Sequence, residues 1–248
     1  MLLFVLGGFV NIDKLAKRIT AAVCSALLFA TVLFAMIPRS PTGAVFVSYG
    51  YGNDTVIAAV SDDGHAVMVG DFSDAAANAN AVKFLSKYRL KRCTLFVTDT
   101  PSNGFGLSGV VNNLPIDKAY ALTDSAYFGM QDDFAKHGVE MVYQMPNTVV
   151  GDSVAVRSVF NGVLVAVTVK VGEIDLCLVT GNGGNVLDLV TYADLYALCD
   201  GASVYDYVQS GVTTFSRFQT ACSDNYGANK YGNFTIKQKD DRIVFNFS

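Results

Sequence analysis

A run of nineteen residues without a charged side chain, Ile19 to Ile37, most restricts how this chain can fold. The run reads ITAAVCSALLFATVLFAMI, and its length is close to the ~20 apolar residues that a helix needs to cross a bilayer core. We therefore predict a transmembrane helix over residues 19–37, in contact with the lipid bilayer. On this prediction residues 1–43 form a membrane anchor and residues 44–248 form one folded domain.

Basic residues on one side of this run predict its orientation. Lys14, Lys17 and Arg18 precede it against a single acidic residue, Asp13, whereas Arg39 is the one charge that closely follows. Cytoplasmic flanks of membrane helices carry the excess of Lys and Arg. We therefore expect a protein of the cell membrane whose N-terminus is cytoplasmic and whose C-terminal domain is extracytoplasmic.

The first ten residues, MLLFVLGGFV, are also apolar but too few to span a bilayer. They lack the basic n-region that a signal peptide shows. We interpret them as the end of a preceding membrane helix, which would make this chain a fragment of a longer channel protein. A membrane-surface anchor and a cleaved secretory signal are the alternatives.

Charge and cysteine content narrow the function classes. The net charge of −4 argues against a domain that neutralises many phosphates by itself. Cys93 and Cys177 fall inside strand-like runs, where a buried thiol is expected. No C-x-x-C spacing occurs, which makes a thiolate zinc site improbable. Cys199 and Cys222 fall in less regular sequence, and an extracytoplasmic location would permit a disulfide between them.

Strand and helix patterns alternate through the first half of the domain. The expected elements are a strand over 44–49, two strands within 54–72 joined at Asp63-Gly64, a helix over 73–90, a strand over 93–98, a helix over 106–113, a strand over 118–122, a helix over 125–137 and a strand over 139–144. The Asp-Gly pair between apolar runs is a strong hairpin signal.

The second half repeats the order of strands followed by a helix. Residues 152–182 contain three β-branched runs broken at Asn161-Gly162 and Gly172-Glu173, which predicts a three-stranded meander. Residues 185–199 have helical periodicity, and 232–238 with 242–247 predict a terminal hairpin. We therefore expect an α/β class of the four-layer α+β kind, with two packed sheets and helices on their outer faces.

Four stretches together resemble the C-terminal part of ComEC-type competence proteins, the membrane channels of bacterial DNA uptake. They are VFVSYGYGNDTVIAAVSDDGHAVMVGDF, LFVTDTPSNGFGLSGV, IDLCLVTGN and YGNFTIKQKDDRIVFNF. The resemblance implies a metallo-β-lactamase-like αββα sandwich preceded by a transmembrane helix. It also implies incoming DNA or a channel subunit of a DNA-uptake system as the partner.

In that family the loop after the second stretch's strand reads Thr-His-x-His-x-Asp-His before a Gly and binds metal. Here the Thr is kept as Thr98, and the ligand positions fall on Asp99, Pro101, Asn103 and Gly104, with Asn182 at the later bridging Asp. The resemblance therefore implies a pseudoenzyme without catalytic residues or a metal cofactor. Its remnant metal-loop pocket would consist of Thr98, Asp99, Asn103 and Asn182. Alternatively, the last three only bond loop amides as Asx turns or caps.

The histidine count points the same way. A dinuclear zinc hydrolase needs several imidazoles and carboxylates around an open coordination position, and this chain has two histidines. His65, beside a turn, is expected to face solvent, and His137 is expected to end a helix before Gly138.

Two other functions remain open. One is an active metal-dependent hydrolase or nuclease with an altered mononuclear site of Asp71, Asp99 and one histidine, His65 or His137. Its cofactor would be zinc or manganese, and its carboxylates suit Mg²⁺ or Mn²⁺ better than zinc. The other is an anion or nucleotide site at the Gly-rich stretch VTGNGGNV, which opens an expected helix but lacks a Lys in Walker spacing.

The predicted orientation can be tested with one introduced cysteine. In intact cells, Thr42→Cys should react with a membrane-impermeant thiol reagent, because residue 42 lies outside the cytoplasm if the basic residues at 14, 17 and 18 stay inside. Ala16→Cys is the matched control on the other flank and should react only after lysis. Labelling of Thr42→Cys only after lysis would contradict the orientation.

Overall fold

The structure is a computed structural model, and its backbone is described over ten segments. These are residues 14–36, 43–50, 54–101, 106–143, 147–150, 153–180, 193–199, 213–218, 225–239 and 242–247. The chain divides into two compact units, Met1–Pro38 and Arg39–Ser248.

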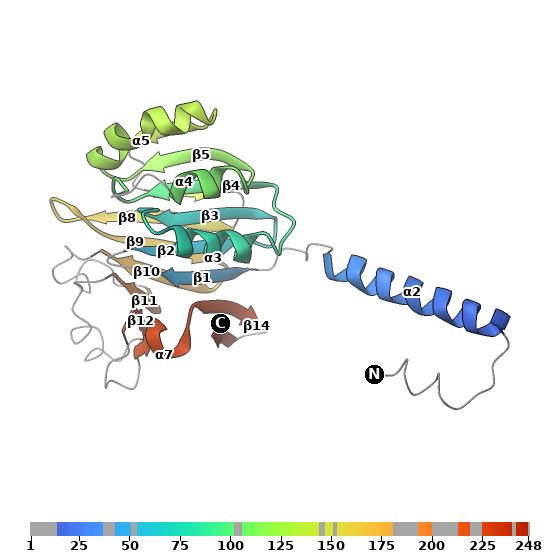
Figure 1. The fold of residues 1–248 in the computed structure, drawn as a ribbon. Coiled ribbons are helices and arrows are strands. Elements are labelled where there is room, and N and C mark those ends of the chain that lie inside the picture. Colours follow the sequence, from blue (N-terminus) through green and yellow to red (C-terminus); the bar gives the residue numbers. More distant parts are fainter. Residues whose placement is uncertain are drawn as a thin grey trace. The chain divides into compact units, whose positions relative to one another are not determined.

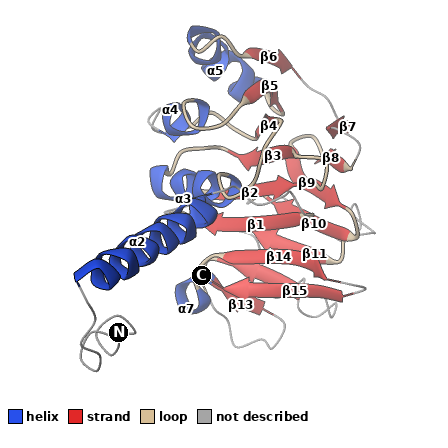
Figure 2. Cartoon of the chain, turned by 90° about the vertical axis from the view of Figure 1, so that its right-hand side faces the viewer, coloured by secondary structure: helices blue, strands red, loops and turns tan. Residues whose placement is uncertain are grey.

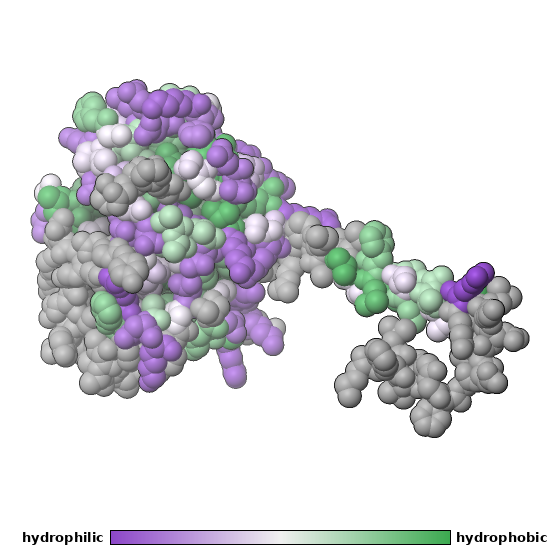
Figure 3. Space-filling view, in the orientation of Figure 1, coloured by the Kyte–Doolittle hydropathy of each residue, from purple (hydrophilic) through white to green (hydrophobic). Residues whose placement is uncertain are grey.

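The first unit contains helix α2 (Lys14–Met36), which has 23 residues and covers the apolar run up to residue 36. Figure 3 shows hydrophobic side chains along the described part of this helix. The large apolar side chains that are exposed there are Ile19, Val23, Leu27, Leu28, Phe29 and Val32. Among the helices of the described segments, none has the length and hydropathy together that a membrane crossing requires.

The second unit contains two β-sheets, of which the first has eight strands in the order β15-β14-β1-β2-β3-β4-β5-β6. Their bounds are β1 (Ala44–Tyr49), β2 (Thr55–Val60), β3 (His65–Gly70), β4 (Arg92–Val97), β5 (Ile116–Ala121), β6 (Glu140–Tyr143), β14 (Phe234–Lys239) and β15 (Arg242–Phe247). Strands from β15 to β3 pair antiparallel, and strands from β3 to β6 pair parallel.

The second sheet has seven strands in the order β13-β12-β11-β10-β9-β8-β7. Their bounds are β7 (Asn147–Val150), β8 (Val154–Phe160), β9 (Leu164–Val171), β10 (Ile174–Val179), β11 (Leu195–Leu198), β12 (Thr213–Ser216) and β13 (Asn225–Gly227). Strands β7 to β10 form an antiparallel meander, and β10 to β13 run parallel.

Three helices follow from the parallel pairing of the first sheet. Parallel neighbours need a crossover connection, and α3 (Ala75–Leu85), α4 (Gly106–Val111) and α5 (Asp124–Lys136) supply those between β3, β4, β5 and β6. All three lie on the same side of that sheet (Figures 1 and 2). The short helix α7 (Ala228–Tyr231) precedes β14.

Side-chain caps set where two of these helices begin. Asp74 accepts a hydrogen bond from the backbone N–H of Ala77 at 2.7 Å, which caps α3. Thr123 caps α5 through the backbone N–H of Ala126 at 3.2 Å. This cap also fixes the start of α5 at the end of β5, next to the cavity described below.

Side chains alternate along each strand of the first sheet, so they pack into two separate cores, one on each face of the sheet. Phe46 faces the helices and stacks on Phe84 of α3, with ring centroids 5.0 Å apart. Phe96 faces the other sheet and stacks on Tyr120 at 5.2 Å. Because both faces of the central strands are buried, their sequences are nearly continuous apolar runs.

Most of the predicted elements are confirmed, including the hairpin turn at Asp63-Gly64 and the packing of two sheets. The predicted helix over 185–199 is wrong at its end, because residues 195–198 form the buried strand β11. A short apolar run that is buried on both faces does not show the period of two that identifies a strand. Residues 181–192, the rest of that prediction, lie outside the described residues.

The predictions for three individual residues are also confirmed. Cys93 and Cys177 are fully buried, and burial raises the pKa of both thiols above the usual range. His137 is the C-cap of α5 and is followed by Gly138, whose φ of 71° lies in the left-handed region that favours glycine.

Removing a ring from the core between the sheets should destabilise the domain. Phe96→Ala should lower the free energy of unfolding by about 3–5 kcal/mol, because Phe96 is fully buried and the cavity would stay partly unfilled. Urea unfolding of the full-length chain measures this effect. Phe128→Ala is the matched control, since Phe128 is 71% exposed, and should change stability by no more than about 0.5 kcal/mol. Equal effects of the two substitutions would contradict the assignment of this core.

Candidate functional site

A cavity of about 650 Å³ opens where several strands of both sheets end. Its lining combines side chains from the first sheet and α5 with side chains from the second sheet. The lining residues are Thr55, Asp71, Thr98, Asp99, Leu122, Thr123, Asp124, Ser125, Tyr143, Phe160, Gly162, Val163, Leu164, Leu178, Thr180 and Cys199. The volume is within the range of small-molecule binding sites.

The first sheet contributes polar residues that continue rows of core side chains. Phe96 packs between the sheets, and Thr98, two residues further on, lines the cavity. Val69 and Asp71 have the same relationship at the end of β3. Alternate residues of a strand share a face, so each apolar row turns polar where its strand ends.

Gly70 allows the start of β2 to lie close to the end of β3. A Cβ atom at Gly70 would lie 2.9 Å from the backbone oxygen of Thr55, which is closer than real Cβ atoms approach. The absence of a side chain at residue 70 therefore lets Thr55 sit beside the β3 end that carries Asp71.

The second sheet contributes a matching pair of strand ends. Leu178 and Ala197 belong to the core between the sheets, and Thr180 and Cys199, each two residues further on, line the cavity. The Thr180 hydroxyl donates to the backbone oxygen of Leu164 at 2.8 Å, which ties β10 to the start of β9. The cavity is therefore closed on one side by the meander β8–β10.

Asp99 is held by the start of α5. Its carboxylate accepts hydrogen bonds from the Ser125 hydroxyl at 2.6 Å and from the backbone N–H of Thr100 at 2.7 Å. The Thr123 hydroxyl donates to the backbone oxygen of Thr98 at 3.0 Å. These bonds join the loop after β4 to the cap of α5, so the position of Asp99 depends on both.

The rim of the cavity is apolar and aromatic. Tyr143 of β6 is 41% exposed, and its hydroxyl donates to the carboxylate of Asp124. Phe160 and Val163, at the β8–β9 turn, are 38% and 50% exposed. The mouth therefore offers apolar contact area beside the exposed carboxylates of Asp99 and Asp124, while Thr55 and Thr98 are buried.

A second carboxylate, Asp54, adjoins the cavity behind Asp71. Burial, a hydrogen bond with Asp71 and the negative charges of Asp71 and Asp74, partly offset by Arg217, together raise the pKa of Asp54 to about 7. The Asp71 carboxylate also accepts bonds from the backbone N–H and the hydroxyl of Ser73 at 3.2 and 3.1 Å. Asp54, Asp71 and Asp74 thus lie close together, in addition to Asp99 and Asp124 at the same end of the first sheet.

The structure brings together part of the site that the sequence predicts. Thr98 and Asp99 of the predicted remnant pocket line one cavity, together with Asp71 of the alternative carboxylate site, and the strands that precede Thr98 and Thr180 are largely buried. Asn103 and Asn182, the other two predicted residues, lie outside the described residues.

Sequence reasoning missed most of the hydroxyl lining. Thr55, Thr123, Ser125 and Thr180 all contribute to the cavity. Thr55 begins β2 and Thr180 directly follows β10, whereas Thr123 and Ser125 lie at the start of α5. A polar residue that continues an alternating apolar row was the signal that could have identified Thr55 and Thr180.

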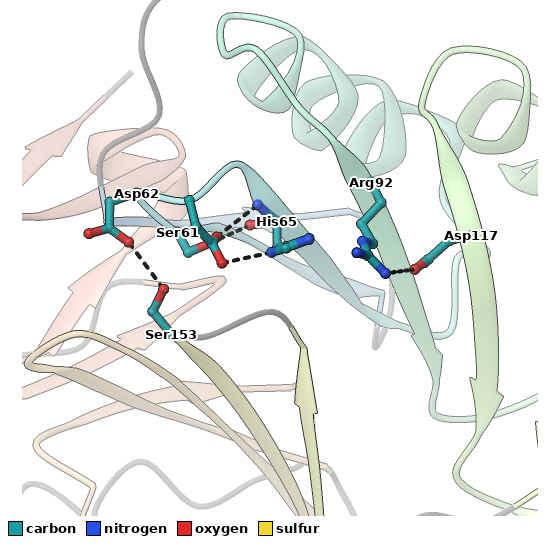
Figure 4. Close-up of polar contacts among 7 residues, drawn as sticks. Ser61, Asp62, His65, Arg92, Asp117 and Ser153 are labelled. Atoms are coloured by element: carbon teal, nitrogen blue, oxygen red, sulfur yellow. Dashed lines mark hydrogen bonds and ion pairs between the residues drawn. The ribbon is translucent and has the colours of Figure 1, made fainter.

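His65 is not where the sequence predicts it, because it is buried rather than facing solvent. Its side chain turns back to the β2–β3 turn, where its Nδ1 lies 2.7 Å from Asp63 Oδ2 (Figure 4). The Ser61 hydroxyl donates to the same carboxylate. Asp63 bonds both the backbone N–H and the ring of His65. These two bonds explain why His65, although it lies next to a turn, is buried.

Neither histidine reaches the cavity. His65 begins β3 and Asp71 follows its end, which separates them by roughly 20 Å of extended chain. His137 ends the 13-residue helix α5, roughly 20 Å from the Asp124 end that lines the cavity. The structure therefore brings Asp71 and Asp99 together but places both candidate histidines elsewhere.

Among the described segments, no group of three His, Cys, Asp or Glu residues is arranged to hold a metal ion. Cys222 and most of the Gly-rich stretch after Thr180 lie outside those segments. The disulfide with Cys199 and the anion site therefore stay predictions.

No protein-family model and no curated protein matches this chain. Among solved structures, it is similar to one described as a new diphosphatase from the PhnP family. The TM-score is 0.51 at 10% sequence identity, over 84% of this chain and 100% of that chain. At this identity the likeness shows the fold alone. That diphosphatase has a metallo-β-lactamase fold, so the two packed sheets described above form a metallo-β-lactamase-like sandwich, as predicted.

The raised pKa of Asp54 predicts how stability depends on pH. An unfolded aspartate titrates at about 3.9, whereas folded Asp54 keeps its proton up to about pH 7. The folded state therefore binds more protons between these values, and the free energy of unfolding should fall as the pH rises from about 4 to about 7. Asp54→Asn should remove this contribution and flatten the pH dependence.

Urea midpoints of the full-length chain at pH values across that window measure the effect. Asp132→Asn, which changes an exposed carboxylate of α5, is the control and should leave the pH dependence as it is. An Asp54→Asn chain whose midpoint falls with pH as steeply as the parent's would show that Asp54 is not the titrating group.

Proposed function

We propose that this chain is a membrane-anchored, extracytoplasmic domain of a ComEC-like DNA-uptake protein that uses the cavity of its metallo-β-lactamase-like fold to bind a ligand rather than to hydrolyse one. On this proposal it is a pseudoenzyme. Its partners would be incoming DNA or a separate channel subunit, in keeping with the resemblance of its four stretches.

The placement of the histidines carries this proposal. The chain has two histidines, and both lie roughly 20 Å along their elements from the cavity residues. A hydrolytic zinc site needs imidazoles and carboxylates that converge on an open coordination position. Here Thr98 and Asp99 keep the position of such a loop, whereas residues 101 and 104, Pro and Gly, offer no side-chain ligand atom.

The membrane anchor is supported by the N-terminal unit. Although no helix of the described segments meets the length and hydropathy of a membrane crossing, α2 has 23 residues, and its large apolar side chains from Ile19 to Val32 are exposed rather than packed. An uncharged apolar surface of this kind is stable when lipid covers it. The basic residues before it support a cytoplasmic N-terminus and an extracytoplasmic domain.

One observation favours a second candidate function, an active hydrolase with a carboxylate site. Asp71 and Asp99 line the same cavity, and carboxylate oxygens suit Mg²⁺ or Mn²⁺. In that case no imidazole would take part, since His65 and His137 lie elsewhere. The relative's diphosphatase activity belongs to that protein and gives this candidate only a shared fold.

Metal content and nuclease activity test the two candidates on one preparation. The full-length chain, purified in detergent and in buffer with zinc and manganese, should hold no stoichiometric metal and should not cleave DNA with or without Mn²⁺. The physical reason is that metal affinity depends on the number and charge of ligands held in place.

Elemental analysis and a nuclease assay give the two readouts, and Asp99→Ala is the diagnostic variant. About one metal ion per chain together with cleavage that Asp99→Ala abolishes would overturn the proposal in favour of the carboxylate hydrolase. Asp132→Asn controls for the loss of one carboxylate away from the cavity.

A further inference from the structure

We propose that the cavity binds a small organic amine, whose ammonium groups meet the hydroxyls of Thr55 and Thr98 and the carboxylates along the strand ends. This inference rests on the proposed function, because it treats the cavity as a binding site and not as a hydrolytic centre. It goes further by naming the chemical class of the ligand.

The hydroxyls of Thr55 and Thr98 in the cavity wall form no hydrogen bond with the described residues. Thr55 and Thr98 are 3% and 9% exposed and line the cavity, and their hydroxyls have no hydrogen-bond partner among the described residues. Each follows the inter-sheet face of its strand, so each hydroxyl is directed into the space between the sheets. Neither hydroxyl is among the fully enclosed unpartnered atoms of the described residues, so both can be reached from the cavity and can bond a ligand atom there.

The other hydroxyls of the cavity already use their protons. Ser125 donates to Asp99, Thr123 to the loop after β4, Thr180 to the start of β9 and Tyr143 to Asp124. What they still present to the cavity is lone pairs. A ligand that brings N–H donors therefore matches these lone pairs, and the hydroxyls of Thr55 and Thr98 can accept from it as well.

Charge selects among donor-rich ligands. Asp71, Asp99 and Asp124 contribute three carboxylates, and the described lining residues include no Lys, Arg or His. An anion such as a phosphate ester would face like charges on several sides, whereas an ammonium group forms charge-assisted hydrogen bonds with carboxylates.

The rim favours an organic cation over a bare metal ion. Tyr143, Phe160 and Val163 expose apolar surface at the mouth, and methylene groups between the nitrogens of an amine would pack on it. An aromatic face also attracts an ammonium group. The volume of about 650 Å³ accommodates a molecule of several carbon atoms rather than one ion.

Calorimetric titration of the full-length chain in detergent tests the inference, with spermidine as the probe. Spermidine should bind saturably with one site per chain. Sorbitol, a neutral polyol, and inorganic phosphate should not bind under the same conditions. Saturable binding of either in place of spermidine would overturn the inference.

Two substitutions locate the binding site. Asp99→Asn should weaken spermidine binding about tenfold or more, because it removes a charge-assisted bond, and Thr98→Val should weaken it about threefold to tenfold. Asp132→Asn, on an exposed part of α5, is the matched control and should leave binding unchanged. Equal weakening by all three would show charge attraction without a defined site and would overturn the inference.

The thermal midpoint of each variant shows whether it folds. If Asp99→Asn is unfolded, Thr98→Val, which keeps the shape of the side chain, decides the outcome alone. The proposed function and this inference fail in different ways. DNA cleavage or stoichiometric metal refutes the proposed function, whereas a chain that neither cleaves DNA nor binds spermidine refutes only the amine.

Discussion

Burial of both faces of the eight-stranded sheet is the constraint on which the domain depends. One face packs on α3, α4 and α5, and the other packs on the second sheet. Each central strand must therefore supply mainly apolar side chains on both faces, and the parallel pairs among them must be joined by helices. Both features are present in β1 to β4 and in the helices that connect β3 to β6.

The cavity follows from this arrangement. The rows of side chains between the sheets are apolar along the strands and become polar at the strand ends, as from Phe96 to Thr98 and from Leu178 to Thr180. The facing rows of both sheets change from apolar to polar at the same edge. A cavity with polar walls therefore forms at that edge. Asp99 is fixed in it by Ser125 and by the cap of α5, so the site is part of the same packing that holds α5 in place.

A shared sandwich does not carry a shared chemistry. The diphosphatase with this fold and the present chain are 10% identical, and the chemistry of a site lies in its side chains. Here the cavity combines carboxylates and hydroxyls with an aromatic rim, whereas His65 serves the β2–β3 turn and His137 ends α5. The proposals about binding therefore rest on this lining and not on the shared fold.

The sequence by itself determined the elements with strong local signals. The hairpin at Asp63-Gly64, the cap at Asp74 and the apolar runs of β4 and β10 depend on neighbours in the chain, so their positions could be read from it. Only the tertiary structure decided that residues 195–198 form a strand and that His65 is buried, because both depend on contacts that local periodicity does not encode. The same holds for the cavity, since Thr55, Thr98 and Thr180 lie far apart in sequence and meet only when the two sheets pack.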